Sequence, residues 1–305
     1  LVVAALLGCL TLAGITTPAI LLALTFAMSL GSAMNMPVWQ AITPELVGKE
    51  QLPAAVTLSG ITINLSRSIG PALAGGIIAV AGTGSVFLLN AASFSGVLWV
   101  LYHWRRTLPK SALPAERVLG AVQAGIRYVR FAPPLQAVLI RSGTYIFFAS
   151  ALFALLPILG RRELGLDALG YGVMLGFWGL GGLAGAFLLP KVRRRISSDR
   201  LVAVATVVYG LMMIVLSHLR DFYGVCEVMI FVGLSSLAVM VSLNVAAQNA
   251  VPAWVRARAL AVHLLVFQGA MAAGSLVWGT LAQRSGLPTA MMAAGIGAIV
   301  SLPLD

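Results

Sequence analysis

The feature that most constrains this chain is a succession of long apolar segments separated by short joints that contain glycine, proline or charge. A helix that crosses the hydrocarbon core of a bilayer needs about 20 mainly apolar residues. By that rule the sequence predicts ten helices, the first of them partial, at residues 1–12, 18–39, 53–81, 85–103, 135–159, 168–189, 201–217, 222–247, 255–281 and 288–304. The apolar runs are continuous and do not alternate with polar residues, so we expect helices and not the strands of a membrane barrel.

The composition favours a bilayer as the solvent of this chain. Hydrophobic residues make up 60% of it, charged residues 10%, and the mean hydropathy is +0.98. A soluble protein of 305 residues would need more charge to cover its surface. The net charge of +11 is also typical of nucleic-acid-binding proteins, but the basic residues lie in short clusters between apolar runs, so we expect no nucleic-acid binding. Cys9 and Cys226 lie in apolar segments without metal-ligand spacing, and we expect neither a metal site nor a disulfide framework.

The distribution of Lys and Arg predicts the orientation of the helices. Fourteen of these 20 residues fall in one set of alternate loops, around residue 49 and at residues 105–130, 191–200 and 256–258. The opposite loops hold four, and the remaining two, Arg67 and Arg141, fall inside helices. The positive-inside rule places the first set of loops in the cytoplasm.

One loop, at residues 104–134, is much longer than the others. It has two basic ends and an amphipathic piece at residues 116–131, which we interpret as a linker helix on the inner face of the membrane. A regulatory or lipid-binding role is the alternative. The loop divides the chain into an N-terminal part, residues 1–103, and a C-terminal part, residues 135–305. Because the sequence starts and stops abruptly inside apolar segments, we expect a fragment that is cut at both ends.

The two parts contain an internal repeat. Residues 40–44, QAITP, and residues 248–252, QNAVP, each follow an apolar helix and precede a short charged loop. The repeat predicts two pseudo-symmetric six-helix halves, the first of which lacks two helices before residue 1. Transporters are commonly built in this way, with substrate held between the halves at the middle of the membrane. In the helix after each motif a shift of 204 residues aligns Asn64 with Gln268, Gly70 with Gly274, and Gly75 with Gly279.

Five stretches carry a resemblance to a known family. They are TPELVGKEQLPAAVTL at 43–58, NLSRSIGPALAGG at 64–76, ALLPILGRRELG at 154–165, GAFLLPKVRRRI at 185–196, and the long stretch from QNAVP to AQRSG at 248–286. All five resemble the major facilitator superfamily, and GAFLLPKVRRRI is a degenerate form of its Gly- and Arg-rich loop between helices eight and nine. The other four resemble, within the superfamily, the group that contains the enterobactin exporter and related drug and macrolide efflux proteins. The resemblance extends along nearly the whole chain.

The resemblance implies an all-α membrane protein with the major facilitator fold, in which residues 1–103 are helices three to six and residues 135–305 are helices seven to twelve. It implies a multi-pass protein of the bacterial inner membrane that exports a siderophore or drug-like amphipathic molecule by alternating access. Proton antiport would drive the export, with no cofactor beyond the proton gradient. We expect the partners to be the lipid bilayer and a small-molecule substrate, and the protein to be a monomer. An importer or facilitator of the same fold, and a non-transporting scaffold or receptor, are the alternatives.

No enzyme motif is visible in the sequence, and we expect no enzymatic activity. The chain contains neither the glycine-rich loop of nucleotide-driven pumps, Gly-x-x-x-x-Gly-Lys, nor a zinc-protease or serine-hydrolase motif.

Arg67 lies at the centre of the predicted helix 53–81 and therefore near the middle of the bilayer. A lipid-facing arginine there costs about 2.5–3.5 kcal/mol on insertion scales, so the side chain should face the protein interior or a water-filled cavity. Gly60, Asn64, Arg67 and Pro71 share one face of this helix. Two roles are open: Arg67 binds an anionic or catechol-like substrate group or biases a gate, or it bonds to backbone carbonyls near Pro71 and joins two helices.

The run Gly70, Pro71, Gly75 and Gly76 resembles the exporter signature of the superfamily on its fifth helix. Its spacing differs from that signature by one residue, and Ser66 stands where an earlier glycine is usual. The run predicts a place of close helix packing and bending.

Other polar residues within helices complete the set of candidates. Asn64, Asn244, Gln248 and Gln268 either bind substrate along a transport pathway or hydrogen-bond neighbouring helices. Glu227 is either a proton-binding carboxylate or an interfacial residue that reaches the outer water. We interpret His263 as a packing residue. Glu45 and Arg256, in the matching inner loops, are candidates for a gate at the cytoplasmic side.

Overall fold

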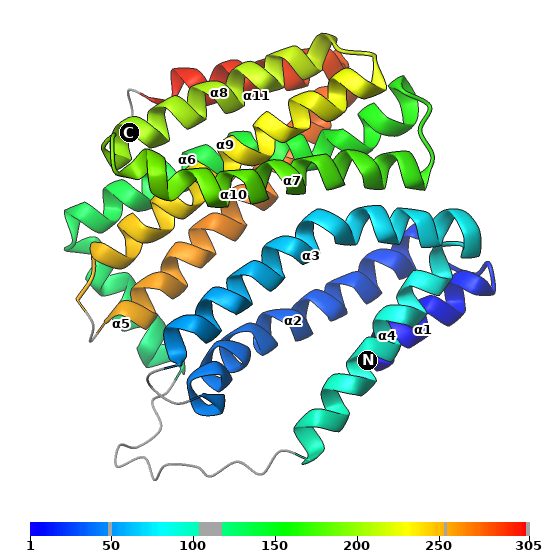
Figure 1. Cartoon of the computed structure of the whole chain (residues 1–305), viewed down its shortest axis with the longest axis horizontal. Coiled ribbons are helices and arrows are strands. Elements are labelled where there is room, and N and C mark those ends of the chain that lie inside the picture. The colour runs from blue at the N-terminus through cyan, green and yellow to red at the C-terminus, as the bar shows by residue number, and fades with distance from the viewer. Residues whose placement is uncertain (48–50, 104–117, 253–254, 303–305) are drawn as a thin grey trace. The chain divides into compact units, whose positions relative to one another are not determined.

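The computed structural model describes residues 1–47, 51–103, 118–252 and 255–302. Within these ranges the side chains of residues 33–46, 52–57, 59–61, 63, 64, 67, 68, 118–122, 124, 256 and 257 lie outside the description. Every regular element in the described ranges is a helix, which confirms the predicted all-α class. The helices are α1 (Val2–Leu12), α2 (Pro18–Leu46), α3 (Leu52–Ala81), α4 (Thr83–His103), α5 (Val118–Arg130), α6 (Pro133–Ile158), the π-helical η1 (Leu159–Glu163), α7 (Ala168–Arg193), α8 (Ser198–His218), α9 (Phe222–Asn249), α10 (Arg256–Ser285) and α11 (Leu287–Val300) (Figure 1).

Six of these helices are long and apolar enough, over their described residues, to cross a membrane: α4, α6 with η1, α7, α8, α9 and α10. Shorter apolar stretches occur in α1, α2, α3 and α11. The α2 and α3 backbones run for 29 and 30 residues, or about 44 Å at 1.5 Å per residue, which exceeds the thickness of a bilayer core. The chain is therefore a multi-pass membrane protein.

The predicted repeat is visible in the positions of the helices. The helices α9, α10 and α11 begin at residues 222, 256 and 287, each 204 residues after the starts of α2, α3 and α4 at 18, 52 and 83. Thr17 caps the N-terminus of α2 and Asp221 caps that of α9, each through a side-chain oxygen that accepts a backbone N–H. At the other end, α3 stops at Gly82 and α10 at Gly286, with φ of 77° and 87°, a backbone region that favours glycine.

The chain forms two compact units. Unit 1 comprises Leu1–Lys110 with Asp167–Val173, and unit 2 comprises Ser111–Leu166 with Met174–Asp305. The first turn of α7 is therefore grouped with unit 1 and the rest of α7 with unit 2. The division into parts at residues 103 and 134 stays a prediction.

In unit 1 the glycine-containing run of α3 packs closely against the start of α7. A Cβ on Gly75 would collide with the backbone carbonyl of Ala168, and a Cβ on Gly172 would collide with that of Pro71. Pro71 itself lies inside α3, which continues beyond it to Ala81. Small residues of this kind let two backbones approach where lipid supplies no hydrophobic driving force between helices.

In unit 2, α6 packs on α10 and α11, and α8 packs on α9 and α11. The helices α7 and α9 also approach closely, and Gly181 faces the carbonyl of Ile230 while Gly233 faces the carbonyl of Trp178. Buried aliphatic and methionine side chains fill the space between the helices, among them Leu152, Leu155, Met213, Leu216, Met229 and Met291. The amphipathic α5 packs on α6 and α10. A Cβ on its Gly125 would lie 3.0 Å from the Arg258 carbonyl oxygen.

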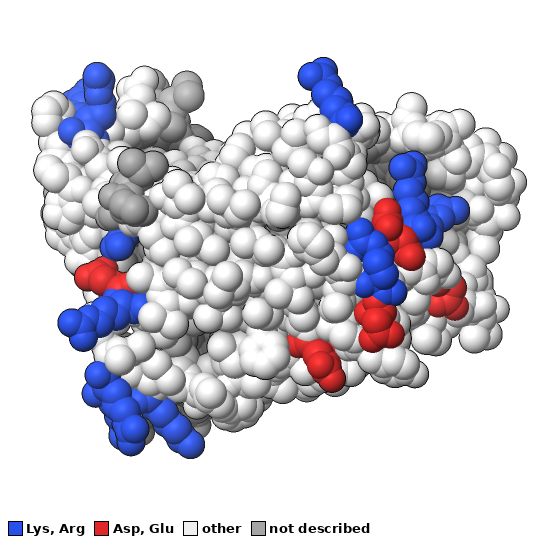
Figure 2. Space-filling view, turned by 90° about the horizontal axis from the view of Figure 1, so that it is seen from above, with Lys and Arg blue, Asp and Glu red and all other residues white. Residues whose placement is uncertain are grey.

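Charged side chains gather near the ends of the helices. Lys191 and Arg193 are in the last turn of α7, Asp199 is in the first turn of α8, and Arg284 is in the last turn of α10. The visible face in Figure 2 has a broad uncharged band between its groups of charged side chains. Large apolar side chains on unit 2, such as Phe187 and Leu276, are 71% exposed. This distribution suits helices that are surrounded by lipid along their middle.

Candidate functional site

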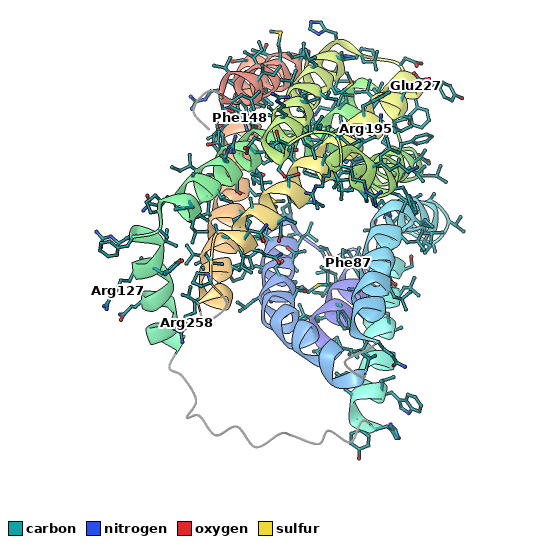
Figure 3. The ribbon with its side chains drawn as sticks, turned by 60° about the vertical axis from the view of Figure 1, so that its left-hand side comes forward. Phe87, Arg127, Phe148, Arg195, Glu227 and Arg258 are labelled. Atoms are coloured by element: carbon teal, nitrogen blue, oxygen red, sulfur yellow. The ribbon has the colours of Figure 1, made fainter. Side chains whose placement is uncertain are left out.

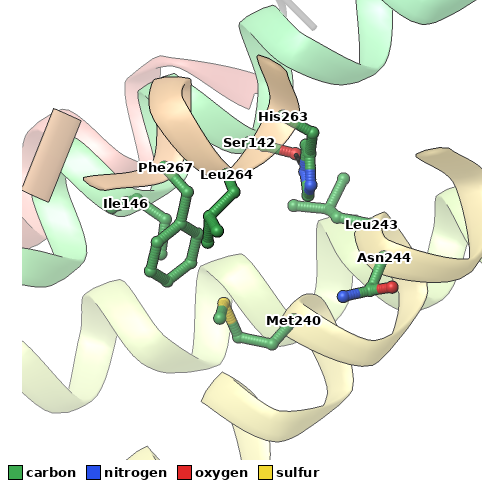
Figure 4. A pocket seen from close by; sticks show the side chains of 8 residues that line it. All are labelled: Ser142, Ile146, Met240, Leu243, Asn244, His263, Leu264 and Phe267. Atoms are coloured by element: carbon green, nitrogen blue, oxygen red, sulfur yellow. Dashed lines mark hydrogen bonds between the residues drawn. The ribbon is translucent and has the colours of Figure 1, made fainter. Parts of the chain in front are cut away.

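A pocket of about 170 Å³ lies within unit 2, between α6, α9 and α10 (Figure 4). The residues that each helix contributes lie within about one turn of one another and so share one side of the helix. Its lining residues are Ser142 and Ile146 from α6, Met240, Leu243 and Asn244 from α9, and His263, Leu264 and Phe267 from α10.

The pocket lies toward one end of its three helices. The distribution of Lys and Arg predicts that this end faces the cytoplasm. At 1.5 Å per residue, Asn244 lies about 8 Å from the end of α9 at Asn249, and His263 lies about 10 Å from the start of α10 at Arg256. Ser142 lies about 14 Å from the start of α6 at Pro133. At these distances from the helix ends, the three residues lie within the membrane-covered part of their helices or beside a cavity that opens into it.

Three polar side chains reach the pocket. The Nε2 atom of His263 lies 3.0 Å from Ser142 Oγ, a hydrogen bond that joins α10 to α6. Asn244 accepts a hydrogen bond of 2.7 Å at its Oδ1 atom from Gln248 Nε2, one turn further along α9. In Figure 4 the amide nitrogen of Asn244 points toward the pocket and its oxygen points away. The pocket therefore offers an imidazole, a hydroxyl and an amide N–H.

Aromatic groups and hydrogen bonds to carbonyls stabilise the helices beyond this pocket. Trp278 Nε1 donates to the Phe147 carbonyl at 2.8 Å, which joins α10 to α6. Tyr209 Oη donates to the Ala149 carbonyl at 2.9 Å, which joins α8 to α6. The ring of Phe148, labelled in Figure 3, lies with its centroid 5.7 Å from that of Trp278. These contacts fix the position of α6 between its neighbours.

The end of unit 2 that we predict to be cytoplasmic holds two further polar links between helices. Arg141 Nη1 lies 2.9 Å from Asp199 Oδ1, and Arg193 Nη2 lies 3.0 Å from Ser242 Oγ. Arg141 was one of two arginines that the sequence places inside a helix. Its side chain is 24% exposed and pairs with Asp199 in the first turn of α8, which is 81% exposed, so the charge of Arg141 has a partner that is in contact with water.

The opposite end of unit 2 carries an ion pair between Arg220 Nε and Glu163 Oε2 at 3.0 Å. It joins the turn before α9 to η1. Glu227 is exposed on α9, in the second turn of that helix. In Figure 3 it lies at the end of unit 2 opposite to Arg127 and Arg258.

The structure brings together only some of the residues that the sequence singled out. Asn244 and Gln248 bond to each other, whereas Gln268 is exposed on α10 and is not among the residues that line the pocket. Gly75 is buried at a helix contact, and no described atom lies within 4 Å of a Cβ placed on Gly70 or Gly76. The side chains of Asn64, Arg67, Glu45 and Arg256 lie outside the described residues, and their roles stay predictions.

Two residues of this site were not predicted to be functional. His263 was interpreted as a packing residue, and Ser142 was not singled out; they are 121 positions apart in the sequence. The sequence signal was a polar residue on an otherwise apolar helix face in each case. Among the described residues, no group of three or more His, Cys, Asp or Glu side chains could hold a metal ion.

Solved structures share the fold. A transporter of the POT family, in a complex with 5-aminolevulinic acid, matches 99% of this chain and 78% of its own chain, with a TM-score of 0.68 and 17% identity. A bacterial homologue of the human lysosomal transporter Spinster matches 99% of this chain and 77% of its own, with a TM-score of 0.65 and 14% identity. At this identity the likeness establishes the fold.

A family model described as transmembrane secretion effector matches residues 1–304. Together with the helices and their repeat, the match defines the class: a multi-pass membrane transporter of the major facilitator type, which resides in a lipid bilayer and binds a small-molecule substrate. The chain belongs to the transmembrane secretion effector family of that superfamily.

Two curated relatives are siderophore transporters by name. The staphyloferrin A transporter of Staphylococcus aureus is 28% identical over 271 residues, which is 88% of this chain and 67% of the relative. The enterobactin exporter EntS of Citrobacter koseri is 27% identical over 188 residues, which is 59% of this chain and 44% of the relative. The predicted membership of the major facilitator superfamily, close to siderophore transporters, is confirmed.

Proposed function

We propose that the protein exports a small amphipathic molecule, of the siderophore or drug-like class, across the bacterial inner membrane by alternating access. The observation that carries this proposal is the match of the secretion-effector family along residues 1–304. The relatives named for staphyloferrin A and enterobactin make a siderophore the favoured class of substrate. The repeat of 204 residues supports alternating access, because in transporters two related halves move against each other around a central site.

We propose that exchange with protons drives the export, and that the monomer needs no cofactor and performs no chemical step on its substrate. Glu227 is the acidic residue to test for proton binding, since it is the one that the sequence places inside a predicted helix. The variant Glu227→Gln keeps the size of the side chain and removes its titration. If export by this variant still depends on the proton gradient, the proton is carried by another group.

The proposed transport pathway includes Asn64 and Arg67 from α3 and three residues from the second unit. Arg67 supports this assignment because a positive charge at mid-helix is costly unless it faces the protein interior or water. Glu45 and Arg256 are proposed to close the cytoplasmic side of the pathway. The three pathway residues of the second unit are Asn244, Gln248 and Gln268.

Flux in everted inner-membrane vesicles tests the function. Vesicles that contain the full-length protein are supplied with labelled enterobactin or staphyloferrin A while their lumen is acidic. We expect uptake of at least one of the two into the vesicles and loss of that uptake when a protonophore is added. Vesicles without the protein give the background.

The possible results separate the alternatives. Uptake into right-side-out vesicles but not into everted ones would identify an importer. Uptake that survives the protonophore would contradict proton antiport but not export. The absence of flux for both siderophores and for a panel of amphipathic drugs would contradict transport of this class and favour a scaffold or receptor.

A further inference from the structure

We propose that the pocket between α6, α9 and α10 is a subsite that binds one neutral, hydroxyl-bearing ring of the transported molecule. The inference rests on the proposed transport function and adds to it the chemical class of the group that is bound. It also assigns a binding role to Ser142 and His263.

The size of the pocket limits what it can hold. A cavity of about 150 Å³ accommodates one benzene ring, whereas sites for drug-sized ligands are about 300–1,000 Å³. At about 170 Å³ the pocket is large enough for one substituted ring. A larger amphipathic molecule would place one of its arms here and leave the rest outside.

The pocket has an apolar side and a polar side. In Figure 4 the side chains of Ile146, Leu264 and Phe267 lie together on one side, and Asn244 lies across from them. Met240 lies between these two groups. A ring that packs against Phe267 and Met240 can therefore present its substituents to polar atoms, which an aliphatic chain would leave without partners.

The charge of the pocket selects a neutral substituent. None of the described residues that line it is Lys, Arg, Asp or Glu. Arg141 is next to Ser142 in the chain, but its guanidinium pairs with Asp199. A carboxylate in this pocket would lose hydration without gaining a positive partner, which is costly. A hydroxyl group avoids this cost, because it can both donate and accept a hydrogen bond.

The pocket offers polar atoms to hydroxyl groups of a ring at two places, on α6 with α10 and on α9. Ser142 Oγ and the imidazole of His263 form one hydrogen-bonding pair, and the Asn244 amide nitrogen is a separate donor on α9. The Asn244 oxygen already accepts from Gln248, which fixes the orientation of the amide. The ligand can enter, because Leu264 is 53% exposed and Asn244 is exposed as well.

Three ring-sized probes test this inference by direct binding to the full-length protein in lipid nanodiscs, with saturation-transfer NMR as the readout. They are catechol, benzoate and toluene. We expect catechol to bind more tightly than the other two, and the His263→Leu and Asn244→Leu variants each to weaken catechol binding by about tenfold. His218→Leu is the matched control, since His218 is an exposed histidine at the end of α8, and it should bind catechol as the parent does.

A labelling experiment keeps the proposal testable if the histidine variant folds poorly. The chain has two cysteines, so Cys9→Ala and Cys226→Ala provide a background for Asn244→Cys. We expect catechol to slow the reaction of this cysteine with N-ethylmaleimide. Tyr223→Cys, at an exposed position of the same helix, is the control and should react at the same rate with and without catechol.

Equal binding of benzoate and catechol, or catechol binding that neither pocket variant changes, would overturn the proposal. Protection of the cysteine by lipid acyl chains but not by catechol would overturn it in favour of a lipid site. Siderophore flux separates this inference from the proposed function. Full export by variants that no longer bind catechol contradicts the subsite alone, whereas catechol binding in a parent protein without flux contradicts the transport function alone.

Discussion

The helices α3 and α10 are equivalent in the repeat, yet their surroundings differ. Both have 30 residues, and both end at a glycine with positive φ. Gly274 of α10 is in close contact with Phe147 and Ser150 of α6, whereas no described atom lies within 4 Å of a Cβ on its counterpart Gly70. The repeated sequence therefore determines where each helix starts and ends, while its neighbours determine how closely it packs.

The ionisable residues of these two helices differ as well. At the position of Arg67, near the middle of α3, the shift of 204 residues places Met271 in α10. At the position of His263, in the second turn or so of α10, α3 has Ser59. Away from its two ends, each helix thus carries one ionisable group that the other lacks, and at a different depth.

The difference in packing predicts the largest effect on stability. Gly274→Val places a branched side chain against the Phe147 carbonyl, and we expect overpacking to cost about 2 kcal/mol. Gly70→Val should cost less than about 1 kcal/mol, because its Cβ meets no described atom and valine is the better helix former. Thermal unfolding of both variants in detergent measures the difference. Equal losses would show that these two aligned positions are packed alike.

A smaller effect on stability is expected at Trp278 of α10. The equivalent position of α3 in the repeat is Ala74, so only α10 has this tryptophan. The variant Trp278→Phe keeps the aromatic contact with Phe148 but removes the hydrogen bond to the Phe147 carbonyl. We expect a loss of about 1 kcal/mol in the same unfolding measurement. A stability equal to that of the parent would mean that this bond does not hold α10 to α6.

The smallest effect is expected at the ion pair of Arg141 and Asp199. Asp199 is 81% exposed, so solvent screens the pair, and Asp199→Asn should change stability by less than about 1 kcal/mol. The change should shrink further when salt is raised to about 1 M, where the screening length is about 3 Å. A large loss of stability that is insensitive to salt would show that the pair is shielded from water. Arg141 would then be held in the protein interior, as we expect for Arg67.

The sequence predicted the helices and the repeat because both depend on local patterns. Apolar length marks a spanning segment, and the starts of α9, α10 and α11 follow the same shift of 204 residues that aligns Gly70 with Gly274. The ends were predicted less well. The helix α2 continues to Leu46, beyond the expected end at residue 39, because hydropathy marks the end of the apolar run and not of the hydrogen-bonded backbone.

The pocket could not be predicted, because it depends on how three helices are rotated about their own axes. Ser142, Asn244 and His263 are polar residues of mainly apolar helices, and such residues usually bond to a neighbouring helix. Only the packing of α6 against α10 brings Ser142 and His263 within hydrogen-bonding distance. The same reason applies to Arg141, whose partner Asp199 is 58 residues away in the sequence.

The most direct test of the asymmetry between α3 and α10 is a comparison of siderophore export by two variants. Arg67→Met gives α3 the residue that α10 has at the equivalent position, and Met271→Ala changes that residue in α10. Export into everted vesicles is measured for both variants at matched amounts of folded protein. The account predicts that Arg67→Met lowers the flux by about tenfold or more, the effect of losing one hydrogen bond to a charged group, while Met271→Ala stays close to the parent. Equal flux in the parent and in Arg67→Met would contradict the account.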